Sequence, residues 1–227
     1  MKVRFKFSKH GVLKYIGHLD LMRYFQKAFR RTDIEVLYSK GFSPHMIMSF
    51  AQPLGVGVES DGEYFDVEVA DEEDISTMVA KLNEQMAEGV VILDVVKLPE
   101  KFTNAMASVA AADYELNFYK ESPLSTALLD KYKAADAVTF VKTTKTGEHI
   151  INVKEFVFDI ALKDDATLFV TVDASSAGNL KPANLLEALL KLEDKSVADY
   201  PFHILRKDTY MRDASGNLVP LNKVDYE

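Results

Sequence analysis

The spacing of apolar positions changes along the chain, and the changes predict its secondary structure. Residues 2–8 alternate polar and apolar side chains, which is typical of a strand with one buried face. Apolar positions recur at helical spacing from about Leu19 to Arg31, and again from Ile75 to Met86. Further extended stretches lie at 46–50, 63–69 and 90–96. Strand, helix, strand, strand, helix, strand is the ferredoxin-like split βαβ order.

The second half repeats this order without a visible sequence repeat. A strand is predicted over 109–119, a helix to about Ala134, long alternations over 150–172, a helix from Pro182 and a closing strand over 200–211. The stretch 98–107 contains proline and small residues and is expected to join two domains. We therefore expect an α+β protein made of two ferredoxin-like (βαββαβ) subdomains in tandem, with mainly antiparallel sheets, at residues 1–105 and 106–227.

Positive charge gathers at the start of the chain. The whole sequence carries a formal net charge of −8, yet its first fifty residues hold ten Lys and Arg against three acids. Arg23, Lys27, Arg30 and Arg31 project from one side of the first predicted helix, because they are spaced at i, i+4, i+7 and i+8. This asymmetry indicates an anion-binding face on an acidic body, although solvated basic stripes are common. The candidate RNA- or anion-binding residues are Arg4, Lys6, Lys14, Arg23, Lys27, Arg30, Arg31 and Lys40.

Composition excludes several classes of protein. The absence of Cys removes disulfides, thiolate nucleophiles and Cys-ligated clusters. No apolar run is long enough to span a bilayer, and the N-terminus has no apolar signal core, so a cytoplasmic location without membrane contact is expected. The sequence contains no Walker lysine or other nucleotide-binding fingerprint, and no cofactor is expected.

Two histidines in the basic segment are candidates for catalysis. His18 opens the first predicted helix and His45 precedes the next strand, so either could act as a general acid or base on an RNA phosphodiester. A cap-region or packed histidine is the competing interpretation. His10, His18, Asp20 and His45 match no compact metal motif, so no metal is expected. Aromatic residues such as Phe42 would be base-stacking platforms if exposed.

Several motifs resemble a known family. They are Gly17-His18-Leu19-Asp20, the loop Tyr38-Ser39-Lys40-Gly41-Phe42-Ser43-Pro44, and Glu59-Ser60-Asp61-Gly62-Glu63-Tyr64. Together they resemble the bacterial radical-SAM-linked domain of unknown function, in its stand-alone form. The residues that carry the resemblance are His18, Asp20, Tyr38, Gly41, Phe42, Pro44 and Glu63. The resemblance implies a radical SAM protein as partner, and without Cys this chain cannot itself hold the radical cluster.

Three hypotheses follow. The first is an accessory protein of a radical SAM enzyme that is not itself catalytic and binds RNA, transfer or ribosomal, through the basic helix face. The second is a metal-independent RNA-processing endonuclease using His18 or His45, by analogy with ferredoxin-like ribonucleases. The third is a protein-interaction module that docks on the radical SAM partner through its basic face.

Overall fold

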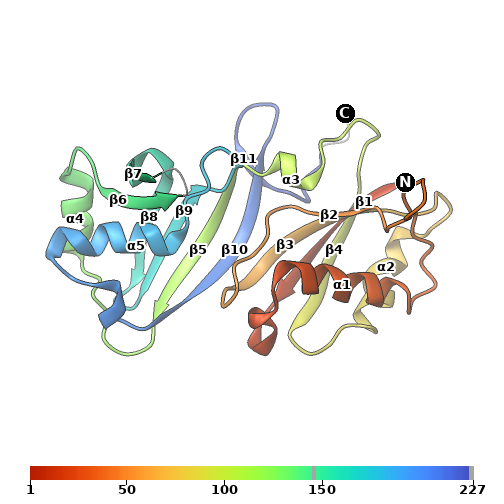
Figure 1. Cartoon of the computed structure of the whole chain (residues 1–227), viewed down its shortest axis with the longest axis horizontal. Coiled ribbons are helices and arrows are strands. Elements are labelled where there is room, and N and C mark those ends of the chain that lie inside the picture. The colour runs from red at the N-terminus through yellow and green to blue at the C-terminus, as the bar shows by residue number, and fades with distance from the viewer. Residues whose placement is uncertain (145–146, 225–227) are drawn as a thin grey trace. The chain divides into compact units, whose positions relative to one another are not determined.

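The computed structural model describes residues 1–144 and 147–224 and has an α+β fold (Figure 1). The strands are β1 (Lys2–Lys9), β2 (Met48–Phe50), β3 (Glu59–Glu68), β4 (Val90–Lys97), β5 (Ala111–Phe118), β6 (Thr139–Thr144), β7 (Gly147–Asn152), β8 (Val157–Asp164), β9 (Thr167–Asp173), β10 (Phe202–Arg212) and β11 (Leu218–Pro220). The α-helices are α1 (His18–Phe29), α2 (Ile75–Asn83), α3 (Ala105–Ser108), α4 (Thr126–Ala134) and α5 (Pro182–Leu190). Short 3₁₀ segments are η1 (Gly11–Tyr15), η2 (Val153–Phe156), η3 (Lys191–Glu193) and η4 (Val197–Asp199).

Hydrogen bonding joins most strands of the described residues into one nine-stranded sheet. Its order is β4-β1-β3-β10-β5-β9-β8, with β2 paired to β3 and β11 paired to β10. β6 and β7 form a separate antiparallel hairpin. No helix in the described ranges is long and apolar enough to cross a lipid bilayer.

The chain divides into two compact units. The first contains Met1–Ala110 and the segment from Asp208 onward, and the second contains Ala111–Lys207. The boundaries predicted from sequence, 1–105 and 106–227, assign the C-terminal segment to the second domain instead. The segment belongs to the first unit because Asp208 and the residues that follow bond to β1 and β3.

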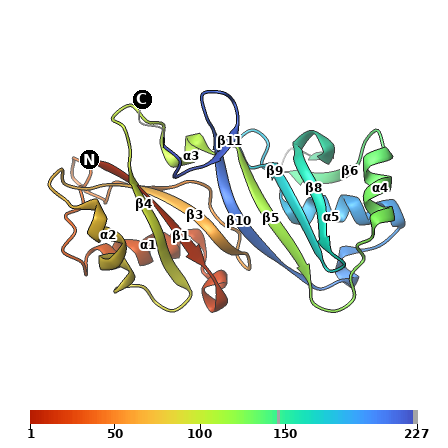
Figure 2. The ribbon, with the colours of Figure 1, turned by 180° about the vertical axis from the view of Figure 1, so that it is seen from behind.

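The core of the first unit lies between its sheet and two helices. β3 is flanked by β1 and β2, and β1 by β4, all in antiparallel register. The alternation of β1 buries Val3, Phe5 and Phe7 against the apolar sides of α1 and α2, which cover the same face of these strands (Figures 1 and 2). The Phe5 ring stacks on Phe65 at 5.0 Å, and Phe7 meets Phe25 edge-on at 4.9 Å. Aromatic pairs of this kind contribute about 0.5–1.5 kcal/mol beyond burial.

The second unit is built on antiparallel ladders of β5 with β9 and of β9 with β8. Alternate residues of β5 and β9, among them Leu116 and Val170, are buried. α5 begins with Pro182 at its first turn, where the missing N–H of proline costs nothing, and buries Leu185, Leu186, Leu189 and Leu190. These leucines are therefore part of the core of the second unit.

Candidate nucleic-acid interface

Helix α1 carries the basic stripe because its other side is apolar. Leu21, Phe25, Ala28 and Phe29 recur at helical spacing and are buried in the core of the first unit. The helix begins after Gly17 and ends at Phe29, so the register of the stripe is fixed by the packing of its apolar side.

The exposed side of α1 ends in three cations. Lys27, Arg30 and Arg31 are exposed, and they lie in the last turn of the helix or just after it. The negative end of the helix dipole favours cations there, which offsets their mutual repulsion. Arg31 donates to the backbone carbonyl of Gln85 at 3.0 Å, an interaction that orients the guanidinium and leaves its charge uncompensated. Within residues 1–144 and 147–224, none of the three forms an ion pair with a carboxylate.

Arg23, one turn earlier, differs from these three. Its guanidinium lies 3.2 Å from the Asp20 carboxylate, and both side chains are exposed. An exposed i,i+3 pair of this kind is worth little in stability, but it compensates the charge of Arg23. Asp20, a residue of the family-like motif, therefore reduces the positive charge of the basic stripe, because it pairs with Arg23 on the same helix.

Arg4 lies in the interior of the unit. Its guanidinium forms a two-pronged ion pair with Asp66, at 2.7 and 3.0 Å, and donates to the carbonyl oxygens of Leu221 and Thr103. The side chain is 0% exposed. The alternation of β1 places Arg4 on the face of the sheet opposite α1 and α2, where residues 102–105 and the C-terminal segment cover it. Arg4 therefore presents no charge at the surface.

Lys6 and Lys14 have carboxylate partners as well. The ammonium of Lys6 lies 2.6 Å from Asp208, and that of Lys14 lies 3.7 Å from Glu59. Lys40 is exposed in the loop between Tyr38 and His45. The structure thus separates the predicted set into four cations paired with acids and four that the described residues leave without such a pair. The second group is Lys27, Arg30, Arg31 and Lys40.

The two candidate histidines lie apart. His18 is half-buried in the first turn of α1 and packs edge-on against Phe50 at 5.3 Å. Burial lowers the pKa of His18 below its usual 6.5. His45 lies five residues before Phe50, and the chain between them runs extended along β3, so the backbone positions of His45 and Phe50 are about 16 Å apart. His18 contacts Phe50 and His45 contacts Ser39, so each histidine remains a separate candidate for acid–base catalysis.

The loop from Tyr38 to His45 is closed by its own ends. Tyr38 and Met46 form a β-bridge, and the Ser39 N–H donates to the carbonyl of His45 at 2.8 Å. The Ser39 hydroxyl also lies 2.8 Å from Nδ1 of His45. Gly41, at φ 116°, has a backbone conformation that favours glycine. Pro44 and Phe42 are exposed, and Tyr38 is partly so.

Glu63, the last of the motif residues, is buried. Its carboxylate accepts a 2.7 Å hydrogen bond from the Ser60 hydroxyl, which in turn accepts from the backbone N–H of Gly62. A Cβ on Gly62 would come within 2.9 Å of the Asp208 backbone, so glycine is required for the close approach of β10. Ser60, Gly62 and Glu63 of this motif therefore build the fold of the first unit and are buried in it.

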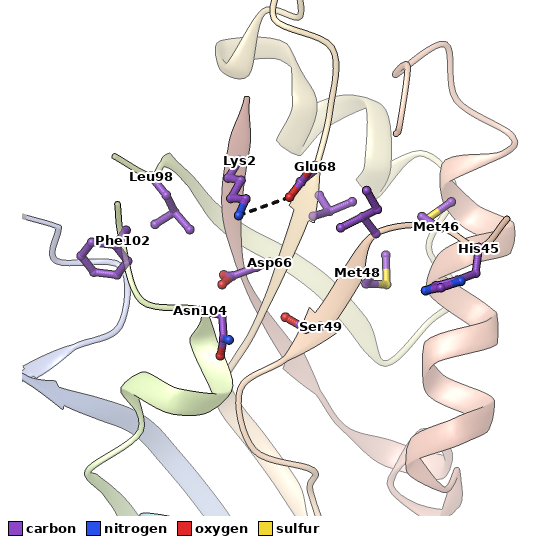
Figure 3. A pocket seen from close by; sticks show the side chains of 12 residues that line it. Lys2, His45, Met46, Met48, Ser49, Asp66, Glu68, Leu98, Phe102 and Asn104 are labelled. Carbon is purple, nitrogen blue, oxygen red and sulfur yellow. Dashed lines mark ion pairs between the residues drawn. The ribbon is translucent and has the colours of Figure 1, made fainter. Parts of the chain in front are cut away.

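A pocket of about 240 Å³ lies beside the loop, next to β2 and β3 (Figure 3). His45, Met48 and Ser49 line it on one side, and Phe102 and Asn104 on another. Its two carboxylates already have partners, since Asp66 pairs with Arg4 and Glu68 lies 3.3 Å from the ammonium of Lys2. The pocket therefore offers polar contacts without a free carboxylate for acid–base chemistry. No cluster of three or more His, Asp or Glu suited to a metal ion occurs in the part of the chain that the structure describes.

Comparison with known proteins gives the family. The model of an uncharacterised protein family conserved in bacteria, DUF2344, matches residues 2–182. The chain belongs to DUF2344. No curated protein matches it. Among solved structures, a chain in the crystal structure of a Cbf5-Nop10-Gar1 complex is similar, with a TM-score of 0.49 and 10% identity. The alignment covers 93% of this chain and 50% of that one.

A partly buried polar network of this DUF2344 protein was not foreseen from sequence. Asp208 accepts from the Tyr64 hydroxyl at 2.7 Å as well as from Lys6, and Asn222 joins Tyr64 to Asp94. Burial and the adjacent Asp208 carboxylate raise the pKa of Tyr64 well above its usual range. These groups come from four distant parts of the sequence, so no local pattern could have grouped them.

Proposed function

We propose that this DUF2344 protein binds RNA through the C-terminal end of α1 and acts as an accessory protein of a radical SAM enzyme in the bacterial cytoplasm. The observation that carries the proposal is the set Lys27, Arg30 and Arg31, exposed on one helix end without carboxylate partners among the described residues. In a chain with net charge −8, repulsion would oppose binding of a polyanion to most other surfaces.

Phosphate contacts explain what this face can do chemically. Arg30 and Arg31 offer forked guanidinium donors, which suit phosphate oxygens, and Lys27 adds a point charge on the same side. Such contacts position a nucleic acid without reading its sequence. A folded RNA such as transfer or ribosomal RNA supplies closely spaced phosphates, and binding releases counterions in proportion to the charges neutralised.

The radical SAM part of the proposal comes from the resemblance of the family-like motifs. The chain has no Cys with which to ligate an iron–sulfur cluster, so the cluster and its chemistry would belong to the partner. The role left to this chain is to hold the RNA near that partner.

A fluorescence titration with labelled transfer RNA tests the RNA proposal. The double variant Lys27→Glu/Arg30→Glu should bind at least about 10-fold more weakly than the wild-type protein, because two attractive contacts become repulsive. The matched control is Lys120→Glu/Lys133→Glu, which changes the net charge equally at exposed positions of the second unit.

The control should bind within about 3-fold of wild type, since it keeps the cations of α1 and alters only exposed charges of the second unit. Equal weakening by both double variants would mean that only net charge matters and would contradict a localised face. Absence of binding by the wild-type protein would remove the proposal.

We also infer that both units are ferredoxin-like. In the first unit, β1 lies between β4 and β3, with β2 beyond β3. In the second, β5 lies between β10 and β9, with β8 beyond β9. Each unit thus repeats the order last, first, third, second strand, and the β6–β7 hairpin is inserted after the first helix of the second unit.

A second candidate function, docking on the radical SAM partner, is favoured by an apolar patch at the other end of α1. Val12, Tyr15, Leu19 and Val56 are each at least 60% exposed. Val12 and Tyr15 share one side of η1, and Gly57, the residue after Val56, donates to the carbonyl of Lys14 at 2.9 Å. Exposed apolar side chains near one another are more typical of protein–protein contacts than of nucleic-acid contacts.

Co-purification with the radical SAM partner separates the two candidates. Docking predicts that Val12→Ser/Leu19→Ser loses the partner while RNA binding is retained. Val91→Ser/Leu93→Ser, on exposed apolar positions of β4, is the control and should retain both. Loss of the partner only with Arg30→Glu/Arg31→Glu would instead place docking on the basic face.

A further inference from the structure

Contacts between its two ends restrain the loop from Ser39 to His45, and the residues in its middle are exposed to solvent. Its two ends are joined by a backbone hydrogen bond, by the 2.8 Å contact between Ser39 Oγ and His45 Nδ1, and by a 3.1 Å bond from the His45 N–H to Ser39 Oγ. Three contacts between the same two residues restrict the loop and reduce the entropy lost when its tip binds a ligand.

The tip of this loop presents a phenylalanine to solvent. Phe42 is 112% exposed, the largest value among the exposed large hydrophobic side chains of the described residues. Lys40 and Gly41 precede it, and Ser43 and Pro44 follow, all of them exposed. A Phe ring in water forgoes about 2–3 kcal/mol of burial, so the Phe42 side chain adds nothing to the core and is available for contact with a ligand.

This tip lies at the same end of the first unit as the cations of α1. β1 and α1 run in opposite directions, joined by η1, so the end of α1 lies near the start of β1. The loop leaves the sheet at that end, because Val36 bridges to Val69 and the N–H of Val69 donates to the carbonyl of Met1. Phe42 and Lys40 thus extend the basic end of the unit.

We propose that Phe42 stacks on an unpaired base of the bound RNA, so that the ligand of this protein is single-stranded at the contact. The inference rests on the proposed RNA binding and adds the class of RNA. An exposed ring beside cations combines a stacking platform with phosphate contacts, the arrangement that holds single strands. Bases within a duplex already have both faces stacked, so a continuous duplex has none to offer Phe42.

The chain contains no Trp, which makes a direct test possible. Phe42→Trp places a single indole at the loop tip, and stacking with a base quenches indole fluorescence. Tyr15→Trp, 66% exposed in the original side chain and at the other end of α1, is the control. Each variant is titrated with a mixed-sequence RNA strand, and with the same strand annealed to its complement.

We expect quenching only for Phe42→Trp with the single strand, and an affinity close to that of wild type. Phe42→Ala should weaken single-strand binding by about 5- to 150-fold and leave duplex binding unchanged, since stacking of one base has this magnitude. RNA binding by wild type with no quenching in the Phe42→Trp variant, or an unchanged Phe42→Ala affinity, overturns this inference alone. No RNA binding at all by the wild-type protein overturns the proposed function itself. Loss of the radical SAM partner by Phe42→Ala with unchanged RNA affinity would assign the ring to a protein contact.

Discussion

At the scale of single residues, Arg4 shows how a charged group is held inside this fold. Its guanidinium bonds to the Asp66 carboxylate and to two backbone carbonyls, and it lies 5.2 Å from the Phe102 ring. Asp66 also accepts from the N–H of Ala105 at the start of α3. A buried ion pair held by several hydrogen bonds is costly to break from one side, because the remaining charge loses its compensation.

Replacement of Arg4 by Met should therefore lower the free energy of unfolding by about 3–5 kcal/mol, because the Asp66 charge then lacks its partner. Urea denaturation measures the effect. Arg23→Met removes an exposed pair and should change stability by less than about 1 kcal/mol. Equal effects of the two substitutions would contradict the structural role of Arg4.

His18 gives the protein a pH dependence of known sign. Its pKa is lowered in the folded state, so the unfolded chain binds a proton more readily and stability falls as the pH falls below 6.5. The unfolding free energy of wild type should decline more steeply between about pH 7 and pH 5 than that of His18→Gln. Chemical denaturation at several pH values measures the difference, and parallel curves for the two proteins would refute it.

At the scale of elements, the exposed edge of β4 is protected by a side chain. Asn83, at the end of α2, accepts from the N–H of Ile92 at 2.8 Å and donates to its carbonyl at 2.9 Å. The amide thus occupies backbone groups that a further strand would use. β4 reads Val-Val-Ile-Leu-Asp-Val-Val-Lys, a segment rich in β-formers, and such edges aggregate when left open.

Asn83→Ala should lower the free energy of unfolding by about 1–3 kcal/mol, since two partly buried backbone groups lose their partner. It should also increase self-association, which analytical ultracentrifugation detects. The neighbouring exposed Glu84→Ala serves as the control. A monomer as stable as wild type would show that the edge needs no protection.

Elements with a strong apolar period were predictable, and their ends were less so. The helix expected over 19–31 is α1, His18–Phe29, and Arg30 already lies outside it as the C-cap. Asp71 and Asp74 are both of a residue type that caps helices, but the Asp71 carboxylate pairs with the N-terminal ammonium, and Asp74 caps α2. The partner of Asp71 is the N-terminal ammonium of Met1, seventy residues away, so no local sequence pattern could predict this pairing.

The sequence predicted part of the candidate site, namely the cations at the end of α1. Helical spacing alone placed Lys27, Arg30 and Arg31 on one side, because that side follows from the apolar one. The count of cations in the first fifty residues also included Arg4 and Lys6. Their partners Asp66 and Asp208 are distant in sequence and come close only in the folded sheet. Charge along a sequence shows how many cations there are, whereas the tertiary fold determines how many remain uncompensated.

At the scale of the whole molecule, the C-terminal segment completes the first unit. The Leu221 carbonyl accepts a hydrogen bond from Arg4. The Asn222 side chain accepts from the Tyr64 hydroxyl and donates to Asp94. Residues 212–217 are mostly polar, yet Leu221 beyond them is fully buried. The segment therefore contributes to the stability of strands that lie two hundred residues earlier.

Ending the chain before Leu218 should lower the melting temperature by roughly 5–10 °C, through loss of these hydrogen bonds and of buried Leu221. Asn222→Ala keeps the bond from Arg4 to Leu221 and should give only part of that decrease. Differential scanning calorimetry measures both. A truncated protein that melts with wild type would contradict the packing of this segment.

The central claim is that uncompensated cations at the end of α1 bind RNA phosphates. Its most direct test is the salt dependence of RNA affinity for wild type and for the neutral variant Lys27→Gln/Arg30→Gln/Arg31→Gln. Three lost phosphate contacts should reduce the slope of log K against log salt by about 2 for a single strand. An identical slope for both proteins would contradict the account.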